Sequence, residues 1–221
     1  MPLPGVVETA AYNAQFWTAF YGFTFGWGFR AAGRANLPRT GPALLVANHQ
    51  SFLDPFLVAL AARRRIAFLA RGNLWNNRLV GRVMTQFWGV PIDRGFGRDG
   101  LAAVVAQLDK GRPVLMFPEG ERTHTGALQP LKAGVALLLK RVSCPIVPVG
   151  VAGAYQAWPR HGKLPTPDPL PLPTDGRAIS VAFGTPIDPS RYDGANRTVL
   201  LTDLQGAIHE AVQQAEQVRR V

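Results

Sequence analysis

The chain has 221 residues, enough for one domain with a substantial core. Its 24 Lys and Arg residues against 14 Asp and Glu give a net charge of +10, which favours an anionic partner: nucleic acid, an anionic membrane or a phosphorylated substrate. Nucleic-acid binding is disfavoured, because 47% of the residues are hydrophobic, only 17% are charged, and the basic residues are scattered. The single cysteine, Cys144, excludes an internal disulfide.

The first thirty residues are rich in aromatic side chains and poor in charge. No residue from 9 to 29 is charged, and nine of the 21 aromatic residues lie between Tyr12 and Phe29. The length allows a membrane span, but Asn, Gln, Thr and Gly dilute the apolar character, and Trp and Tyr favour the headgroup level. We therefore interpret residues 1–30 as a membrane-associating helix or short helical pair lying in the interface. The alternative is a core helix that covers the domain's own apolar surface.

After this segment, short apolar runs alternate with longer amphipathic ones. The near-continuous apolar character of the short runs predicts strands that are covered on both faces. They lie at Ala43–Ala47, Ile66–Ala70, Val90–Asp93, Val114–Phe117, Ile146–Val151 and Ile179–Phe183. Helices are predicted at Asp54–Arg63, Leu74–Phe87, Gly100–Lys110, Lys132–Arg141 and Arg197–Val218. The alternation predicts that residues 31–221 form a single layered α/β domain, with a mostly parallel sheet flanked by helices.

A histidine and an aspartate five residues apart follow the first of these strands, in Asn48-His49-Gln50-Ser51-Phe52-Leu53-Asp54. Neutral imidazole is suited to accept the proton that an alcohol loses as it attacks an acyl carbon. We predict His49 as the general base and Asp54 as the carboxylate that holds its ring in the productive tautomer. The alternative for Asp54 is a plain helix N-cap before Pro55. Backbone N–H groups from Ser51 to Asp54 are candidates to stabilise an oxyanion.

Two further motifs follow predicted strands and carry basic residues, Gly89-Val90-Pro91-Ile92-Asp93-Arg94 and Phe117-Pro118-Glu119-Gly120-Glu121-Arg122-Thr123. Guanidinium groups match phosphate oxygens in pairs, so Arg94 and Arg122 are candidates for phosphate recognition. Glu119 is expected to bind an acceptor hydroxyl or to fix one of these arginines. The alternative is a structural set of salt bridges at a turn. Since sites in α/β sheets form outside the carboxyl ends of strands, we expect His49, Arg94 and Glu119 to converge at one edge.

Four ordered blocks of the chain resemble those of the glycerolipid acyltransferase family and are most similar to the bacterial 1-acyl-sn-glycerol-3-phosphate O-acyltransferases. The blocks are Asn48-His49-x4-Asp54, Gly89-x2-Ile92-Asp93-Arg94, Phe117-Pro118-Glu119-Gly120-x-Arg122-Thr123 and Val147-Pro148-Val149. The resemblance implies that a fatty acyl chain moves from acyl-CoA or acyl-carrier protein to the free hydroxyl of 1-acyl-glycerol-3-phosphate, giving phosphatidic acid. It also implies catalysis by His49 and Asp54, and substrate binding by Arg94, Glu119, Gly120, Arg122 and Thr123.

The expected partners are an anionic membrane surface, a lysophospholipid acceptor and the acyl donor, with no nucleic acid, no cofactor and no metal. The expected location is the cytoplasmic face of the cell membrane, peripheral or monotopic. Glu121 stands where the family often has a small polar residue, and a carboxylate beside a phosphate site weakens anion binding unless it points away. Two alternatives stay open: acylation of a different lysolipid or hydroxylated lipid and, from another class, a non-catalytic protein that binds anionic membranes.

Overall fold

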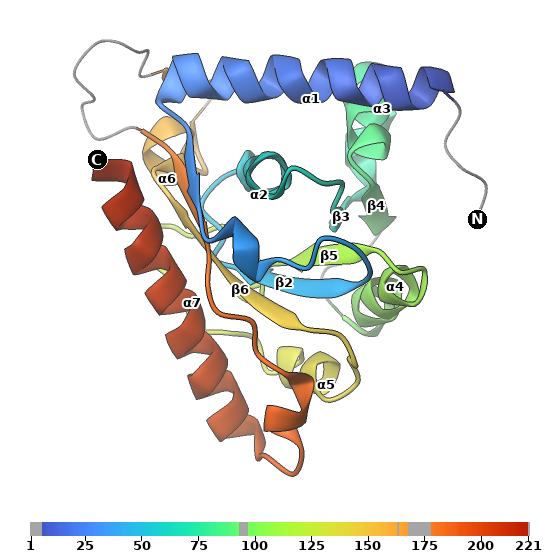
Figure 1. The fold of residues 1–221 in the computed structure, drawn as a ribbon, viewed down its shortest axis with the longest axis vertical. Helices are drawn as coiled ribbons and strands as arrows, with labels where there is room; N and C mark the ends of the chain where they lie inside the picture. The colour runs from blue at the N-terminus through green and yellow to red at the C-terminus, as the bar shows by residue number, and fades with distance from the viewer. Residues whose placement is uncertain (1–5, 93–96, 163, 168–177, 221) are drawn as a thin grey trace.

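The computed structural model describes residues 6–92, 97–162, 164–167 and 178–220, which form a seven-stranded sheet with helices on both faces (Figure 1). The strand order is β1-β7-β6-β2-β5-β3-β4. The strands are β1 (Arg30–Ala32), β2 (Ala43–Ala47), β3 (Ala67–Arg71), β4 (Gly89–Ile92), β5 (Pro113–Met116), β6 (Ile146–Ala152) and β7 (Ser180–Phe183). All neighbours pair in parallel except β6 and β7, which are antiparallel. The predicted mostly parallel α/β sheet is therefore confirmed.

Most predicted helices are found at the expected positions in the sequence, but their lengths differ from the prediction. They are α1 (Val6–Trp27), α2 (Asp54–Ala62), α3 (Arg78–Gln86), α4 (Arg98–Asp109), α5 (Val135–Leu139), α6 (Ala154–Ala157) and α7 (Arg197–Arg220), with the 3-10 turns η1 (Arg34–Asn36), η2 (Gly72–Asn76) and η3 (Pro189–Tyr192). The single helix predicted for 74–87 is wrong. Asn77 has extended backbone there and its side chain accepts hydrogen bonds from the N–H groups of Leu79 and Val80, so that it ends η2 and caps α3.

The two faces of the sheet have separate cores. In β2, Leu45 packs with residues of α1, α2 and α3 on one face, whereas Leu44 and Val46 pack with α4, α5 and α7 on the other. Each residue of β2 is buried, as expected for a central strand covered on both sides. On β6, a side chain at Gly150 would overlap the backbone of Ala211, so the glycine allows α7 to cross the sheet at close range.

The aromatic N-terminal segment is one helix, α1, which lies across α2 and α3 (Figure 1). One face of it belongs to the core, because Tyr12 and Phe16 are 8% and 6% exposed. The other face carries three of the most exposed aromatic side chains, Trp17, Tyr21 and Phe25, spaced one turn apart and in contact along the row. The described part of the chain contains no helix with both the length and the apolar character needed to cross a bilayer.

Candidate active site

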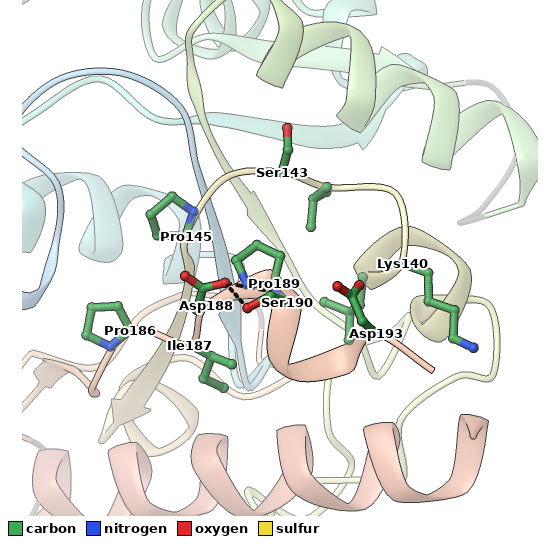
Figure 2. A pocket seen from close by; sticks show the side chains of 11 residues that line it. Lys140, Ser143, Pro145, Pro186, Ile187, Asp188, Pro189, Ser190 and Asp193 are labelled. Carbon is green, nitrogen blue, oxygen red and sulfur yellow. Dashed lines mark hydrogen bonds between the residues drawn. The ribbon is translucent and has the colours of Figure 1, made fainter. Parts of the chain in front are cut away.

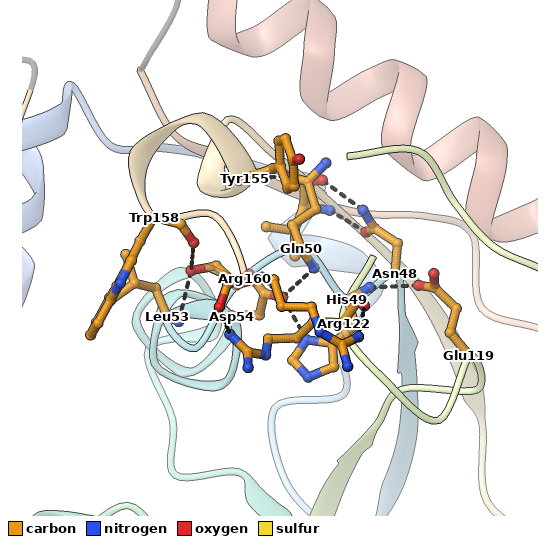
Figure 3. A network of polar contacts seen from close by, with 12 residues as sticks. Asn48, His49, Gln50, Leu53, Asp54, Glu119, Arg122, Tyr155, Trp158 and Arg160 are labelled. Atoms are coloured by element: carbon orange, nitrogen blue, oxygen red, sulfur yellow. Dashed lines mark hydrogen bonds and ion pairs between the residues drawn. The ribbon is translucent and has the colours of Figure 1, made fainter. Parts of the chain in front are cut away.

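The strand order brings three loops together at one edge of the sheet. β2 lies between β5 and β6, and it is parallel to both. Their carboxyl ends therefore lie side by side, and the loops that follow them are 48–53, 117–134 and the segment of α6 up to 162. His49 directly follows β2, the central strand of the three. Figure 3 shows the polar contacts that join them.

His49 and Asp54 are hydrogen bonded. Nδ1 of His49 lies 2.8 Å from Oδ2 of Asp54, and the same oxygen accepts the backbone N–H groups of Gln50, at 2.6 Å, and Ser51, at 2.8 Å. Asp54 is fully buried, while 18% of the His49 side chain is exposed. The alternative, a plain N-cap at Asp54, does not hold: Leu53 occupies that position, and the Asp54 carboxylate accepts N–H groups that precede the helix. The Asp54 carboxylate thus fixes the turn that carries His49.

The imidazole of His49 is also held from the side by an aromatic ring. It stacks on Phe117, with 3.8 Å between the ring centroids and 13° between the planes. Because an ionised carboxylate can only accept hydrogen bonds, Nδ1 of the neutral ring is the donor, and the lone pair lies on Nε2. No described residue forms a hydrogen bond with Nε2 of His49. The ring is therefore oriented with its basic nitrogen available to a substrate.

The backbone of His49 is clamped by the loop after β5. Its N–H donates to Oε1 of Glu119 at 2.6 Å, and its carbonyl accepts the N–H of Thr123 at 2.8 Å. Oε2 of Glu119 accepts the N–H of Gln129 at 2.9 Å, and the Thr123 hydroxyl donates to the carbonyl of Ala127 at 2.8 Å. Glu119 forms no ion pair with an arginine among the described residues. The side chains of Glu119 and Thr123, whose substrate-binding roles remain predictions, position the loop around His49.

Burial sets the ionisation of Glu119. The side chain is 2% exposed, and this burial raises its pKa to about 7, with a smaller contribution in the same direction from the charge of Asp54. The N–H groups of Gln129 and His49 act in the opposite direction, because they stabilise the carboxylate. The group that accepts the backbone N–H of His49 therefore titrates near neutral pH.

Gly120 lies in the tight turn between Glu119 and Arg122. Its φ is +76°, in the left-handed region that favours glycine, and its N–H donates to the carbonyl of Phe117. A Cβ at this position would lie 3.2 Å from the side chain of Lys132. The residue is therefore required by backbone geometry. Its predicted contact with substrate stays a prediction.

Arg122 is oriented by an aromatic side chain from the histidine motif. Its Cζ lies 3.5 Å from the centroid of the Phe52 ring, and its Nη1 makes one long hydrogen bond, of 3.5 Å, to the carbonyl of Arg160. Burial lowers the pKa of Arg122, and Arg160 lowers it further, while Asp54 acts in the opposite direction. The guanidinium thus lies within the field of Asp54 and has most of its donors available.

The remaining predicted residue, Arg94, lies outside the described residues. The strand that precedes it in the sequence, β4, is the edge strand of the sheet, with β3 and β5 between β4 and β2. Of the expected convergence, the structure therefore places His49 and Glu119 in direct contact and does not place Arg94.

Several side chains of the site make contacts that the sequence did not predict. Asn48 forms two hydrogen bonds with the backbone of Val151, at 2.8 and 2.9 Å, and thereby joins the turn to β6. Gln50 accepts the N–H of Tyr155, and Ser51 donates to the carbonyl of Trp158. These contacts tie the histidine motif to the segment after β6, which no sequence motif marks. Phe117 is the first residue of the motif after β5, but the sequence places it only at the end of a strand and gives no sign that it stacks on His49.

A hollow of about 720 Å³ lies elsewhere, between α5, the start of β6 and η3 (Figure 2). Its lining includes Lys140, Pro145, Asp188 and Asp193. Pro145 precedes β6, so this hollow is at the amino end of that strand, whereas His49 follows the carboxyl end of its parallel neighbour. It is therefore not part of the site. Among the described residues no group of three or more His, Cys, Asp or Glu side chains could hold a metal ion.

Comparison with known proteins agrees with this geometry. Residues 28–152 match the family model described as Acyltransferase. The chain is 31% identical over 131 residues to the chloroplastic 1-acyl-sn-glycerol-3-phosphate acyltransferase BAT2 of Brassica napus, covering 58% of this chain and 38% of that protein. It is 32% identical over 142 residues to 1-acyl-sn-glycerol-3-phosphate acyltransferase alpha of Homo sapiens, covering 61% and 48%. The chain thus matches less than half the length of these relatives.

A solved structure has the same fold. The 1-acyl-sn-glycerophosphate (LPA) acyltransferase PlsC from Thermotoga maritima aligns with a TM-score of 0.75 and 21% identity, covering 93% of this chain and 78% of that one. The family match includes the histidine motif, the loop after β5 and all of β6. This protein therefore belongs to the acyltransferase family, and its fold is that of the solved family member.

Proposed function

We propose that the protein transfers a fatty acyl chain from acyl-CoA or acyl-carrier protein to the free hydroxyl of 1-acyl-glycerol-3-phosphate, giving phosphatidic acid. The named activity of the relatives from Brassica napus and Homo sapiens supports this reaction. The observation that carries it is the pairing of His49 with Asp54 at 2.8 Å, which leaves Nε2 of His49 without a partner among the described residues.

His49 acts as the general base in this proposal. Nε2 accepts the proton of the acceptor hydroxyl while the hydroxyl oxygen forms a bond to the thioester carbonyl carbon. The carbon–sulfur bond then breaks, and the imidazolium returns the proton to the departing thiolate, so a free thiol is released. Asp54 stabilises the imidazolium and holds its orientation.

A backbone donor for the oxyanion of this step is also available. Of the N–H groups from 49 to 54, most are taken by Glu119, Asp54 and Ser51. The N–H of Phe52 has no acceptor among the described residues. We assign it as a candidate donor to the developing negative charge on the former carbonyl oxygen.

The acceptor phosphate is proposed to bind Arg122, with Arg94 as a further candidate. Arg122 is stacked on Phe52, three residues from His49, and a guanidinium fork suits the oxygens of a phosphate monoester. Glu119, Gly120 and Thr123 complete the predicted acceptor site, with the first and last also positioning His49.

The protein is proposed to work as a peripheral or monotopic protein at the cytoplasmic face of the cell membrane. Support comes from the exposed row of Trp17, Tyr21 and Phe25 on α1, since Trp and Tyr favour the headgroup region. Arg78 and Arg82 on α3 are exposed as well, and basic side chains favour anionic lipid. Location at the membrane would give the site access to lipid acceptors.

Release of free thiol tests the reaction. Purified protein with 1-acyl-glycerol-3-phosphate and either acyl-CoA or acyl-carrier protein should release thiol and form phosphatidic acid. His49→Ala should abolish both, while His209→Ala, a matched change at a surface histidine that contacts Gln213 on α7, should leave them unchanged. Equal turnover by His49→Ala and the wild type would overturn the assignment of the base. Turnover only with another lysolipid in the same assay would show that the acceptor is wrongly assigned, while acyl transfer itself would stand.

A further inference from the structure

Glu121 stands beside the proposed phosphate site and is neutralised by an arginine from another loop. Its Oε2 lies 2.8 Å from Nη1 of Arg160, which follows α6. This hydrogen bond is the largest cause of a lowered pKa at Glu121, so the carboxylate is ionised at neutral pH. The carboxylate therefore does not act on the site as an uncompensated negative charge.

The guanidinium groups of Arg160 and Arg122 each contact the backbone carbonyl of the other residue. Nη1 of Arg160 donates to the carbonyl of Arg122 at 2.9 Å, and Nη1 of Arg122 reaches the carbonyl of Arg160 at 3.5 Å (Figure 3). Two guanidinium groups are thereby brought close enough for each to act on the charge of the other. Like charges repel at this range, and one carboxylate, Glu121, offsets only one of them. The cluster keeps an excess of one positive charge.

Only one of the three guanidinium nitrogens of Arg160 forms hydrogen bonds with other described residues. The contacts of Arg160 with Glu121, with the carbonyl of Arg122 and with the ring of His124 are all made by Nη1. Nη2 and Nε form no hydrogen bond with a described residue. A guanidinium has five N–H donors, and the edge formed by Nε and Nη2 is one of those that bind two oxygens of a phosphate at once. Arg160 thus has a free edge beside Arg122.

We propose that Arg160 is a second residue that binds the phosphate of the acceptor, and that Glu121 sets the affinity by competing with the phosphate for the same guanidinium. The inference rests on the proposed function, because it assigns part of the same site. Arg122 and Arg160 together offer the two forks that a dianionic phosphate monoester can occupy, and Glu121 holds Arg160 in place when the acceptor is absent. Arg160 lies outside the four sequence blocks, so the acceptor specificity includes a residue beyond them.

Replacing Arg160 and replacing Glu121 should change the KM for the acceptor in opposite directions. This difference distinguishes phosphate binding from a purely structural role of the ion pair. Arg160→Ala should raise the KM for 1-acyl-glycerol-3-phosphate by about ten- to a hundredfold with little change in kcat, since a hydrogen bond to a charged group contributes that range of affinity. Arg160→Lys should recover part of it. Glu121→Gln breaks the same ion pair but leaves the guanidinium, and should lower the KM, because the competing carboxylate charge is removed. Arg191→Ala removes an arginine paired with Asp203 on a remote surface and serves as the matched control.

Equal increases in KM for Arg160→Ala and Glu121→Gln would show that the pair only holds the loops together and would overturn the inference. An unchanged KM in Arg160→Ala, with the wild type active, would overturn it as well. Absence of turnover by the wild type with either donor would instead reject the proposed function and this inference with it. If Arg160→Ala fails to fold by circular dichroism, Arg160→Lys and Glu121→Gln still decide the outcome, because their expected effects on KM have opposite signs.

Discussion

Asp54 accepts a hydrogen bond from Nδ1 of His49 at 2.8 Å, and it uses for this the same oxygen that accepts the N–H groups of Gln50 and Ser51. The carboxylate that orients the His49 ring is therefore also the group that shapes the turn on which His49 lies. One oxygen serves both roles, so geometry alone does not distinguish them. A variant that keeps the oxygen and removes the charge does.

Asp54→Asn keeps an oxygen for the turn and removes the negative charge that stabilises the imidazolium. We expect kcat to fall by about 10²- to 10⁴-fold with a smaller change in KM. Asp188→Asn is the matched control, because Asp188 accepts the N–H of Ser190 at the start of η3, away from His49. Steady-state thiol release measures both variants. A comparable loss of kcat in Asp188→Asn would mean that the effect is not specific to the pair.

Glu119→Gln tests whether the loop after β5 positions the base. Glu119 accepts one N–H with each oxygen, whereas the amide of glutamine can accept with one oxygen only. Either His49 or Gln129 then has a buried N–H without an acceptor, at a cost of about 1–3 kcal/mol in unfolding free energy. We expect kcat to fall more than affinity, because His49 shifts while Arg122 stays.

Urea unfolding and thiol-release kinetics measure the two effects. Glu210→Gln, at an exposed position on α7, is the matched control and should leave both near wild type. Wild-type kcat in Glu119→Gln would contradict the positioning role.

The features of the site that depend on residues close together in the chain could be predicted from the sequence. His49 and Asp54 are close in the chain, and the strand before them is a continuous apolar run, so both the pair and its place at the carboxyl end of β2 could be read directly. The contact between His49 and Glu119 could be expected only through the rule that sites form at strand ends, since 70 residues separate them.

The contributions of Phe52 and Arg160 could not be predicted. Stacking of Arg122 on Phe52 depends on how two loops approach each other, and no spacing in the chain encodes it. Arg160 is brought to the site by the position of β6 next to β2, which is a property of the strand order. The break at Asn77 was missed because the apolar period continues through it, while the side chain of Asn77 itself caps α3.

The stability of the protein should depend on pH through Glu119. Its pKa is about 7 in the folded protein against 4.5 for the free group, so the folded state binds the proton more tightly. The stabilisation is therefore full below pH 4.5 and is lost as the pH rises through 7. The full shift corresponds to about 3 kcal/mol.

Wild type and Glu119→Gln should be compared by urea unfolding between pH 4.5 and 8. The advantage of the wild type over the variant is expected to shrink as the pH rises, while its advantage over Glu210→Gln should change little. A difference between wild type and Glu119→Gln that grows with pH would show that the N–H groups of His49 and Gln129 outweigh burial.

Membrane binding should depend on the outer face of α1. Trp17, Tyr21 and Phe25 are 45%, 53% and 61% exposed, so their replacement by serine removes apolar surface that the fold does not use. We expect the triple variant to sediment with phosphatidylglycerol vesicles at least about tenfold more weakly, because the row loses its burial in the lipid interface. The folded state should remain, because the core side of the helix, with Tyr12 and Phe16, is unchanged.

A matched control removes the same number of exposed apolar side chains elsewhere. Leu137, Leu164 and Val199 are 58%, 79% and 57% exposed, and none belongs to α1. Their joint replacement by serine should leave vesicle binding near wild type if the aromatic row is the contact surface. An equal loss in both triple variants would show that general surface hydrophobicity drives sedimentation. Undiminished binding in the α1 variant would mean that the exposed arginines, and not the aromatic row, hold the protein at anionic lipid, and raising the salt concentration would then release it.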